Sequence, residues 1–213
     1  MAVQHVYVAR HGLTEGNIAQ TVQGFDDPLA EQGHRQAMRL AERAKHLEFD
    51  HLIASDMLRA QQTAEYIARV TDHEIITQPL VHEVLRPRSL WGLSHTEPAY
   101  QAFLKHEGVS VEDPQWRLDD GERFVHIQKR ALDTLDYFAS FGEETLFVVS
   151  HGHFVRCLVS TVLMERALTQ DVWTHNSRTL RTHNTGITIL RREIESDHWS
   201  ILSFNDHSHF ADD

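Results

Sequence analysis

Three short apolar runs each end in polar residues, and this repeat constrains the fold more strongly than any other feature of the sequence. Residues 3–9 lead into Arg10-His11-Gly12, residues 51–54 into Ser55-Asp56, and residues 144–149 into Ser150-His151-Gly152. Each run has the length of a short buried strand, and a segment with apolar residues at helical spacing follows it. Strand, loop and helix repeated in this order indicate an α/β protein with a mostly parallel sheet.

The rest of the chain fits the same architecture. Helices are predicted after Pro28, after Asp56, from Gly121 and after His153, and further strands over 74–77, 187–191 and 199–204. We therefore predict a three-layer α/β/α fold, with a mostly parallel central sheet and helices on both faces. The 213 residues suit one domain spanning 1–213, because single domains commonly reach about 250 residues.

The segment 84–120 differs from its surroundings. Its periodicity is poor, and it contains Pro87, Pro98, Pro114, Trp91 and Trp116. Because the segment is too short to form a core of its own, we interpret it as a lid-like insertion within the domain.

The charge balance argues against two classes of partner. The 20 Lys and Arg residues against 31 Asp and Glu residues give a formal net charge of −11 with histidine neutral. Such a chain has no general electrostatic attraction for nucleic acid or an anionic membrane, so a bound phosphate would need a local basic pocket. We expect neither nucleic acid nor membrane as a partner, and most of the 17 histidines should lie at the surface.

Cysteine content and apolar runs bear on the compartment. The single cysteine, Cys157, cannot form an internal disulfide, which argues against a disulfide-stabilised secreted protein. The first residues lack the basic and apolar regions of a signal peptide, and no apolar run approaches about 20 residues. We therefore expect a soluble protein of the cytoplasm.

The first polar strand end has the residue types of an anion site. Arg10 carries a permanent charge whose planar fork suits phosphate oxygens, and Gly12 lets backbone N–H groups approach an anion. Thr14 and Asn17 add neutral donors, while His11 at the strand end would be held rigidly. The alternative interpretation is a loop with a capping threonine and a chance Arg-His pair.

The second strand end offers an arginine near a helix N-terminus. Arg59 lies in the first turns of a helix that Ser55 or Asp56 can cap. A helix N-terminus favours an anion, so Arg59 can face the same pocket as the first strand end. The plainer alternative is a solvent-facing arginine on a capped helix.

The third strand end places His151 at the same sheet edge as His11. Two histidines with Arg10 and Arg59 make a cationic pocket, which in an acidic chain indicates a bound anion. His151 and His153 could instead chelate zinc, but no carboxylate or thiolate stands beside them at ligand spacing, and the arginines would repel a cation. A core histidine without a role is the remaining alternative.

In this order, the three strand ends resemble the motifs of the histidine phosphatase superfamily, also called the phosphoglycerate-mutase-like family. The family pattern R-H-G-x-T-x-x-N matches residues 10–17, S-D-x-x-R-A-x-x-T-A matches residues 55–64, and S-H-G matches residues 150–152. The similarity extends over nearly the whole chain, through Asp27-Pro28-Leu29, Gly33, Asn205-Asp206 and His209. Three motifs in order are more specific than any one alone.

The resemblance implies a role for each of these residues. His11 resembles the nucleophile that takes the phosphoryl group, and the electrostatic clamp around that group would be Arg10, Arg59 and His151. The further phosphate contacts that it implies are Asn17, Gly152 and the backbone at Gln23-Gly24. A nucleophilic histidine must present an unprotonated nitrogen, so its other N–H needs an acceptor, for which a carbonyl near Gly12 is expected.

The leaving alkoxide also needs a proton, and family members use a carboxylate after the third strand. Glu83 occupies that place, although the Gly-x-Trp-Glu-Gly stretch that follows in many members is replaced here by residues 86–92. Asp56 and Glu15 are weaker candidates for the acid. Alternatively, Glu83 is a surface carboxylate paired with Arg86 or Arg88.

Comparison within the family favours hydrolysis. The mutase branch carries Glu-Arg-His-Tyr-Gly after the third strand and a basic cluster further on, whereas this chain has residues 83–87 (EVLRP) and only Arg117 near the expected cluster. We predict a phosphomonoester hydrolase, a metal-independent acid-type phosphatase that acts through a phosphohistidine. Phosphoglycerate-mutase-type transfer is the first alternative, and a non-catalytic phosphate-binding module, which needs the clamp but not Glu83, is the second.

The expected reaction needs no metal and no cofactor, since positioning and charge stabilisation suffice for phosphoryl transfer. The candidates to contact the group beyond the phosphate are Arg86, Arg88, Trp91 and His95. Two arginines favour a small anionic substrate, such as a sugar phosphate or a phosphocarboxylate, unless they are simply solvated charges of the lid. The sequence leaves the oligomeric state open, a homodimer included.

Overall fold

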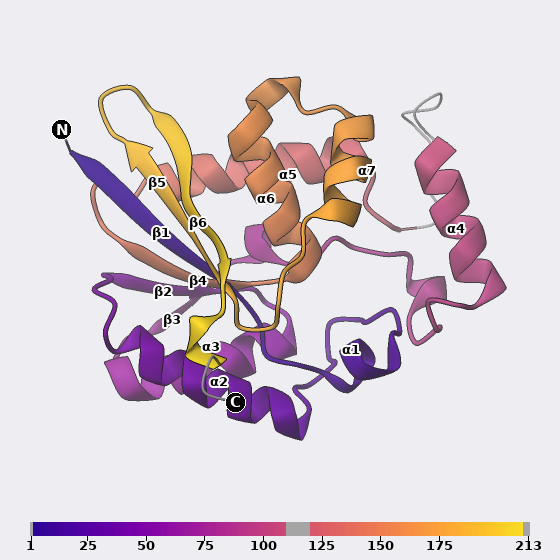
Figure 1. Ribbon diagram of the computed structural model, residues 1–213, viewed down its shortest axis with the longest axis horizontal. Helices are drawn as coiled ribbons and strands as arrows, with labels where there is room; N and C mark the ends of the chain where they lie inside the picture. Colours follow the sequence, from indigo (N-terminus) through magenta and orange to yellow (C-terminus); the bar gives the residue numbers. More distant parts are fainter. Residues whose placement is uncertain (1, 110–119, 211–213) are drawn as a thin grey trace.

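The computed structural model describes residues 2–109 and 120–210, and these residues form a six-stranded sheet covered by helices (Figure 1). The strands are β1 (Val3–Arg10), β2 (His51–Ala54), β3 (Ile75–Thr77), β4 (Leu146–Ser150), β5 (Ile187–Glu193) and β6 (His198–Asp206). Their order is β3-β2-β4-β1-β5-β6, with β3, β2, β4 and β1 parallel and the last two strands antiparallel to their neighbours. The predicted α/β class with a mostly parallel sheet is confirmed.

Helices cover both faces of this sheet, as predicted. They are α1 (Glu15–Ala19), α2 (Glu31–Ala44), α3 (Leu58–Thr71), α4 (Pro98–Val109), α5 (Phe124–Ala139), α6 (Gly152–Met164) and α7 (Gln170–Thr179). Helices α2 and α3 pack on one face, and α5 and α6 pack on the other (Figure 1).

The alternation of side chains along the central strands builds the two layers of core. In β1, Val6 and Val8 pack toward α5 and α6, whereas Ala9 packs toward α2 and α3. Strand β4 is buried over its whole length, as expected of a parallel strand with helices on both faces. The residues that follow these strands therefore start from rigid, close-packed positions.

The carboxyl ends of β1, β2 and β4 lie together at one edge of the sheet. The N–H of His11 donates to the carbonyl of Ser150 over 2.9 Å, and the N–H of Ser55 donates to the carbonyl of Val149 over 3.0 Å. Strand β5 runs antiparallel to β1 and begins at Ile187, which pairs with Ala9. The loop before β5 therefore reaches the same edge as the three predicted strand ends.

Three helices were not expected from the sequence: α1, α4 and α7. Helix α4 lies within the segment 84–120, where Tyr100 and Phe103 pack with Val22 and Leu90 in a small cluster apart from the main core. A helix that packs against a loop has no broad apolar stripe, so periodicity did not predict it. Residues 110–119, which include Pro114, Trp116 and Arg117, lie outside the described part of the chain.

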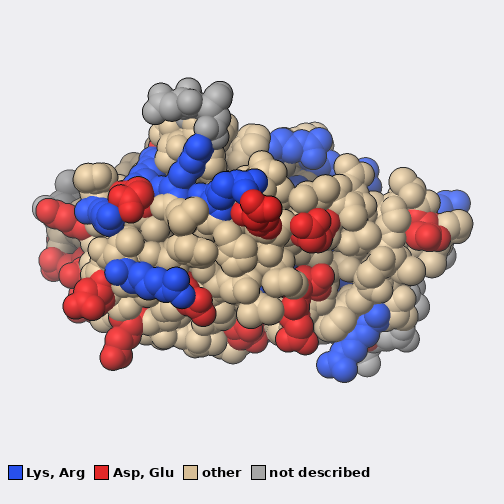
Figure 2. All heavy atoms as spheres, turned by 90° about the horizontal axis from the view of Figure 1, so that it is seen from below, with Lys and Arg blue, Asp and Glu red and all other residues tan. Residues whose placement is uncertain are grey.

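Charges of both signs are interspersed on the face formed by α2 and α3 (Figure 2). Several basic residues there pair with acidic neighbours one turn away, such as Arg69 with Glu65 and Lys45 with Glu42. This face therefore offers no continuous basic surface. Within residues 2–109 and 120–210, no helix has the length and apolar character needed to span a membrane.

Candidate active site

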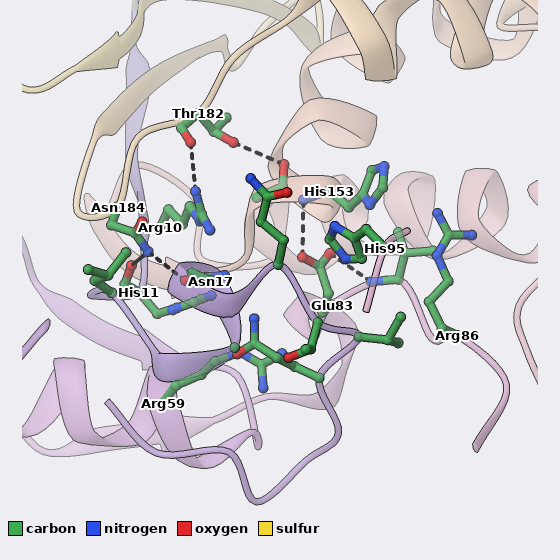
Figure 3. Close-up of a pocket in the computed structure, with 18 of the residues that line it drawn as sticks. Arg10, His11, Asn17, Arg59, Glu83, Arg86, His95, His153, Thr182 and Asn184 are labelled. Atoms are coloured by element: carbon green, nitrogen blue, oxygen red, sulfur yellow. Dashed lines mark hydrogen bonds between the residues drawn. The ribbon is translucent and has the colours of Figure 1, made fainter. Parts of the chain in front are cut away.

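A cavity of about 540 Å³ opens where the strand ends meet (Figure 3). Segments from the whole length of the chain line it, from the β1 end to the loop before β5. Its charged and imidazole side chains are those of Arg10, His11, Arg59, Glu83, Arg86, His95, His153, Arg156, Arg181 and His183. Among the residues that line this cavity, Glu83 is the one carboxylate against five arginines.

His11 follows directly on β1 and is almost fully buried, with 2% of its surface exposed. Its Nδ1 lies 2.7 Å from the carbonyl oxygen of Gly12, which fits the expectation of a carbonyl acceptor near that residue. Burial, and then the charges of Arg59 and Arg10, lower the pKa of His11 well below 6.5. The ring is therefore neutral at pH 7, with its proton on Nδ1 and Nε2 unprotonated.

The loop that carries His11 requires glycine because two backbone segments touch there. A Cβ on Gly12 would lie 2.5 Å from the carbonyl oxygen of Gly33 at the start of α2. The N–H of Gly12 donates to the Thr63 hydroxyl on α3 over 3.0 Å. The β1 end is thus fixed against α2 and α3, which explains why Gly33 and Thr63 accompany the motif.

Arg10 and Arg59 lie beside His11, and a backbone carbonyl accepts a hydrogen bond from the guanidinium of each. Nη1 of Arg10 donates to the carbonyl of Thr182 over 2.8 Å, and Nη1 of Arg59 donates to that of Gly24 over 2.7 Å. Burial lowers the pKa of Arg10 to about 10 and also lowers that of Arg59, although both remain charged at neutral pH. The Nε of each is buried and has no partner among the described residues.

His151 is fully buried, with its ring centroid 5.0 Å from that of His11, and it is not among the residues that line the cavity. Its Nε2 lies 2.8 Å from the Ser55 hydroxyl, and its Nδ1 is buried without a partner among the described residues. Burial, followed by the charge of Arg59, lowers the pKa of His151 well below 6.5, so the ring is neutral.

The prediction that Ser55 or Asp56 caps helix α3 was wrong. Met57 is the N-cap, and no side chain caps the helix. Ser55 instead accepts a hydrogen bond from the Met57 N–H over 3.2 Å and holds the His151 ring. The serine at the end of β2 therefore belongs to the site through His151, which sequence reasoning did not identify.

The further predicted contacts differ in how directly they reach the cavity. Asn17 lines it, and its Oδ1 accepts from the Thr14 N–H and from Nδ2 of Asn184. Gln23 also lines the cavity, whereas the Gly24 N–H donates to Asp27 over 2.7 Å and its carbonyl accepts from Arg59. The backbone of Gly24 is thus engaged within the protein.

Gly152, the first residue of α6, also lines the cavity, where a Cβ would lie 3.1 Å from Nε of Arg10. Asn184, which was not predicted, donates to the carbonyl of His11 over 3.0 Å and to Asn17. The loop before β5 therefore holds both Arg10, through Thr182, and the His11 backbone.

Glu83 projects into the cavity from the loop after β3 (Figure 3). Its Oε1 accepts from the N–H groups of Val84 and Phe154, and its Oε2 accepts from the N–H of His153 over 3.1 Å. The two weaker candidates lie outside the lining: Asp56 approaches His82, and Glu15 is exposed on α1. Both oxygens of the Glu83 carboxylate thus accept backbone N–H groups, and Arg88 pairs with Asp120.

Of the residues expected to reach beyond the phosphate, two line the cavity and two do not. Arg86 and His95 line it. The prediction for Arg88 and Trp91 was wrong: Arg88 is exposed and pairs with Asp120, and Trp91 donates from Nε1 to the Arg86 carbonyl. Arg88 begins a 3₁₀ turn (Arg88–Leu90), and its guanidinium lies 5.8 Å from the Trp91 ring centroid.

Sequence reasoning missed Arg156 and Arg181. Arg156 lies on α6, one turn after Gly152, and that spacing would have placed it on the same helix face. Arg181 lies in the loop before β5, far from the motifs in sequence. Within the described residues, no group of three or more His, Cys, Asp or Glu side chains is arranged to hold a metal ion.

Known proteins resemble this chain over nearly its whole length. The model of the histidine phosphatase superfamily (branch 1) matches residues 6–207. A probable phosphoglycerate mutase GpmB from Proteus mirabilis is 35% identical over 216 residues, which cover 97% of this chain and 95% of the relative. Another from Cronobacter sakazakii is 38% identical over 165 residues, which cover 74% of each chain.

Solved structures share the fold. A mutant phosphoserine phosphatase from Entamoeba histolytica, in complex with phosphoserine, is 24% identical, with a TM-score of 0.80 over 97% of this chain and 99% of that one. A mycobacterial glucosyl-3-phosphoglycerate phosphatase is 23% identical, with a TM-score of 0.77 over 95% and 98%. These similarities extend over nearly the entire length of both chains.

Proposed function

Because the chain belongs to the histidine phosphatase superfamily, we propose that it hydrolyses small phosphorylated metabolites, such as sugar phosphates or phosphocarboxylates, through a phosphohistidine at His11. One observation carries the proposal. A buried, neutral histidine lies beside three buried nitrogens without partners in the described chain, which are Nε of Arg10, Nε of Arg59 and Nδ1 of His151. Such a set suits an anion whose oxygens surround one central atom.

In the first step, Nε2 of His11 attacks the phosphorus of the monoester. The new P–N bond forms as the bond from phosphorus to the leaving oxygen breaks. The Gly12 carbonyl stabilises the positive charge that develops on the ring, because it accepts the Nδ1–H. Arg10 and Arg59 stabilise the charge on the phosphoryl oxygens, and they are already held in place by Thr182 and Gly24.

His151 acts as a neutral donor in this scheme. When the Ser55 hydroxyl donates to Nε2, the ring proton resides on Nδ1, which can then donate to a phosphoryl oxygen. The Ser55 hydroxyl is thus compatible with the tautomer that leaves the proton on Nδ1. Burial keeps the ring neutral, so His151 contributes a hydrogen bond without a third full charge beside His11.

Glu83 serves as the acid and then as the base. Its protonated carboxyl gives a proton to the leaving oxygen in the first step, and its carboxylate takes a proton from the water that attacks the phosphohistidine in the second. That second attack breaks the P–N bond and releases inorganic phosphate, which restores both groups. Oε2 accepts one backbone N–H whereas Oε1 accepts two, so Oε2 retains room for the transferred proton.

Transfer to a second hydroxyl, the reaction of a mutase, is the second candidate function. The names of the curated relatives favour it. The composition after β3 favours hydrolysis, since residues 83–87 (EVLRP) lack the Glu-Arg-His-Tyr-Gly stretch of the mutase branch.

Two assays test the proposal. The first measures hydrolysis of p-nitrophenyl phosphate in EDTA, and the second adds labelled substrate and quenches the reaction with acid to trap the phosphohistidine. We expect turnover and a labelled phosphohistidine that maps to residue 11, and loss of both in His11→Ala. His46→Ala removes an exposed histidine outside the cavity and should leave both unchanged. Full turnover in His11→Ala would refute the mechanism, and a trapped adduct that passes to a phosphoglycerate acceptor would favour the mutase.

Glu83→Gln tests the acid. We expect a loss of about 10²–10⁴-fold in the rate of phosphorylation by an alkyl phosphate, whose leaving oxygen needs a proton. The loss should be much smaller with p-nitrophenyl phosphate, because nitrophenolate leaves without protonation. Equal losses with both substrates would contradict an acid role for Glu83.

A further inference from the structure

The cavity carries more positive charge than one phosphate group requires. Arg10 and Arg59 lie beside His11, yet Arg86, Arg156 and Arg181 line the same cavity. Figure 3 shows Arg86, with His95 and His153, beyond Glu83 on the side away from His11 and Arg59. Arg86 therefore lies past the acid. The charges of Arg86 and Arg181 act on Arg156, whose charge also acts on Arg10, and we call Arg86, Arg156 and Arg181 the second group.

The second group is built from three separate elements. Arg156 lies on α6, where its Nε donates to the Gly152 carbonyl over 3.1 Å and its Nη1 to the Ser177 carbonyl over 2.7 Å. Arg86 lies on the loop after Glu83, with its guanidinium 5.1 Å from the Phe103 ring centroid. Arg181 is exposed on the loop before β5. Packing and backbone bonds orient the first two, which is typical of a binding site rather than of solvated charges.

The charges of this group act on one another. Burial is the main cause that lowers the pKa of Arg156, and the positive charges of Arg181 and Arg86 lower it further. The pKa of His153 lies well below 6.5, chiefly through burial and then through Arg156 and Arg86. The imidazole of His153 is thus neutral. The repulsion among Arg86, Arg156 and Arg181 disfavours their close approach unless an anion binds between them.

We propose that Arg86, Arg156 and Arg181 bind a second anionic group, a carboxylate or a second phosphate, of the same substrate whose phosphoryl group lies at His11. This inference rests on the proposed function. The guanidinium fork suits both kinds of anion. Substrates with an anion a few bonds from the transferred phosphate would therefore be preferred over neutral analogues of the same skeleton.

Matched substrates test this directly, by release of inorganic phosphate. The first pair is 3-phosphoglycerate and glycerol 3-phosphate, which differ by a carboxylate in place of a hydroxymethyl group. The second pair is fructose 1,6-bisphosphate and fructose 6-phosphate, which tests a second phosphate. We expect a preference of about 10- to 100-fold in kcat/KM for the doubly anionic member of at least one pair, as charge-assisted contacts imply.

Variants then assign the preference to the second group. Arg181→Ala should reduce it by about 10-fold, and Arg181→Lys should retain part of it. Arg178→Ala removes the same charge from an exposed site on α7 outside the cavity and should preserve the preference. Because Arg181 is exposed, its replacement should not unfold the protein, which circular dichroism can verify.

Two outcomes would overturn the inference while leaving the proposed function intact: equal kcat/KM within both pairs, or a preference that Arg181→Ala leaves unchanged. Loss of the proposed function has a different signature, since neither p-nitrophenyl phosphate turnover nor a phosphohistidine would then be detected. The two failures are therefore distinguishable in the same set of samples.

Discussion

Arg130 on α5 should be required for both the stability of the fold and the position of Glu83. Its Nε and Nη2 donate to the two carboxylate oxygens of Glu122 over 2.8 and 2.7 Å. Its Nη1 donates to the carbonyls of Leu80 and His82, each over 2.9 Å. The guanidinium thus clamps the segment that leads into Glu83.

The magnitude follows from the burial of this pair. The side chains of Arg130 and Glu122 are 10% and 13% exposed, so water screens the pair only weakly. Arg130→Met would leave the Glu122 carboxylate without its cation, with the Leu85 N–H still donating to it, and would remove the Arg130 donor from the His82 carbonyl. Removal of one partner from a buried pair costs about 3–5 kcal/mol, out of a total stability of about 5–15 kcal/mol for a typical domain.

Urea denaturation at pH 7 measures this cost. Lys129→Ala is the control. Lys129 directly precedes Arg130, and its replacement breaks only an exposed pair with Asp133, so the free energy of unfolding should fall by about 0.5 kcal/mol or less. The double variant Arg130→Met/Glu122→Leu should cost less than the sum of the single changes, because neither charge is then left alone. A cost below about 1 kcal/mol for Arg130→Met would refute the reasoning.

The same variant should affect catalysis through Glu83 alone. At a temperature where Arg130→Met is folded, we expect kcat for an alkyl phosphate to fall more than kcat for p-nitrophenyl phosphate. Arg130→Lys keeps the charge but not the fork, so it should restore only part of the difference. An equal fall with both substrates would show that Arg130 acts on the site as a whole.

Two further predictions concern the buried histidines. Ser55→Ala should lower kcat roughly 10-fold or more, because His151 loses the hydroxyl that holds its ring, whereas Ser55→Thr should retain most activity; equal activity in both variants would contradict this. Stability should fall as pH drops from about 7 to 5.5, because the unfolded chain binds protons at His11, His151 and His153 near pH 6.5, while the folded chain does not. The slope should approach about 1.4 kcal/mol per pH unit for each histidine, and urea titrations that give a flat profile would count against neutral buried rings.

The sequence was most informative where local pattern and burial coincide. The run that forms β4 is buried on both faces, so its apolar character predicted both the strand and the place of His151. The same holds for β1 and His11. Helix α4 lacked such a signal, because its aromatic residues pack against a loop near Val22 instead of against the sheet.

The missed parts of the site depend on contacts distant in sequence. Asn184 bonds the His11 carbonyl across 173 positions, and no motif marks the loop that carries it. Only topology brings this loop to the site, since β5 runs antiparallel to β1 and starts beside Ala9. A strand order predicted with β5 next to β1 would have identified the loop, but periodicity gives the strand and not its neighbour.

The way the two cations are held explains how an acidic protein can keep an anion site ready. The Nη1 atoms of Arg10 and Arg59 donate to the carbonyls of Thr182 and Gly24, so main-chain segments fix both guanidinium groups. Their buried Nε atoms and Nδ1 of His151 have no partner in the described chain. Folding thus bears the desolvation of these groups before any substrate binds, and charge that develops during phosphoryl transfer meets donors that need little reorganisation. Because that arrangement depends on local carbonyls and not on net charge, the −11 of the whole chain does not weaken it appreciably at short range.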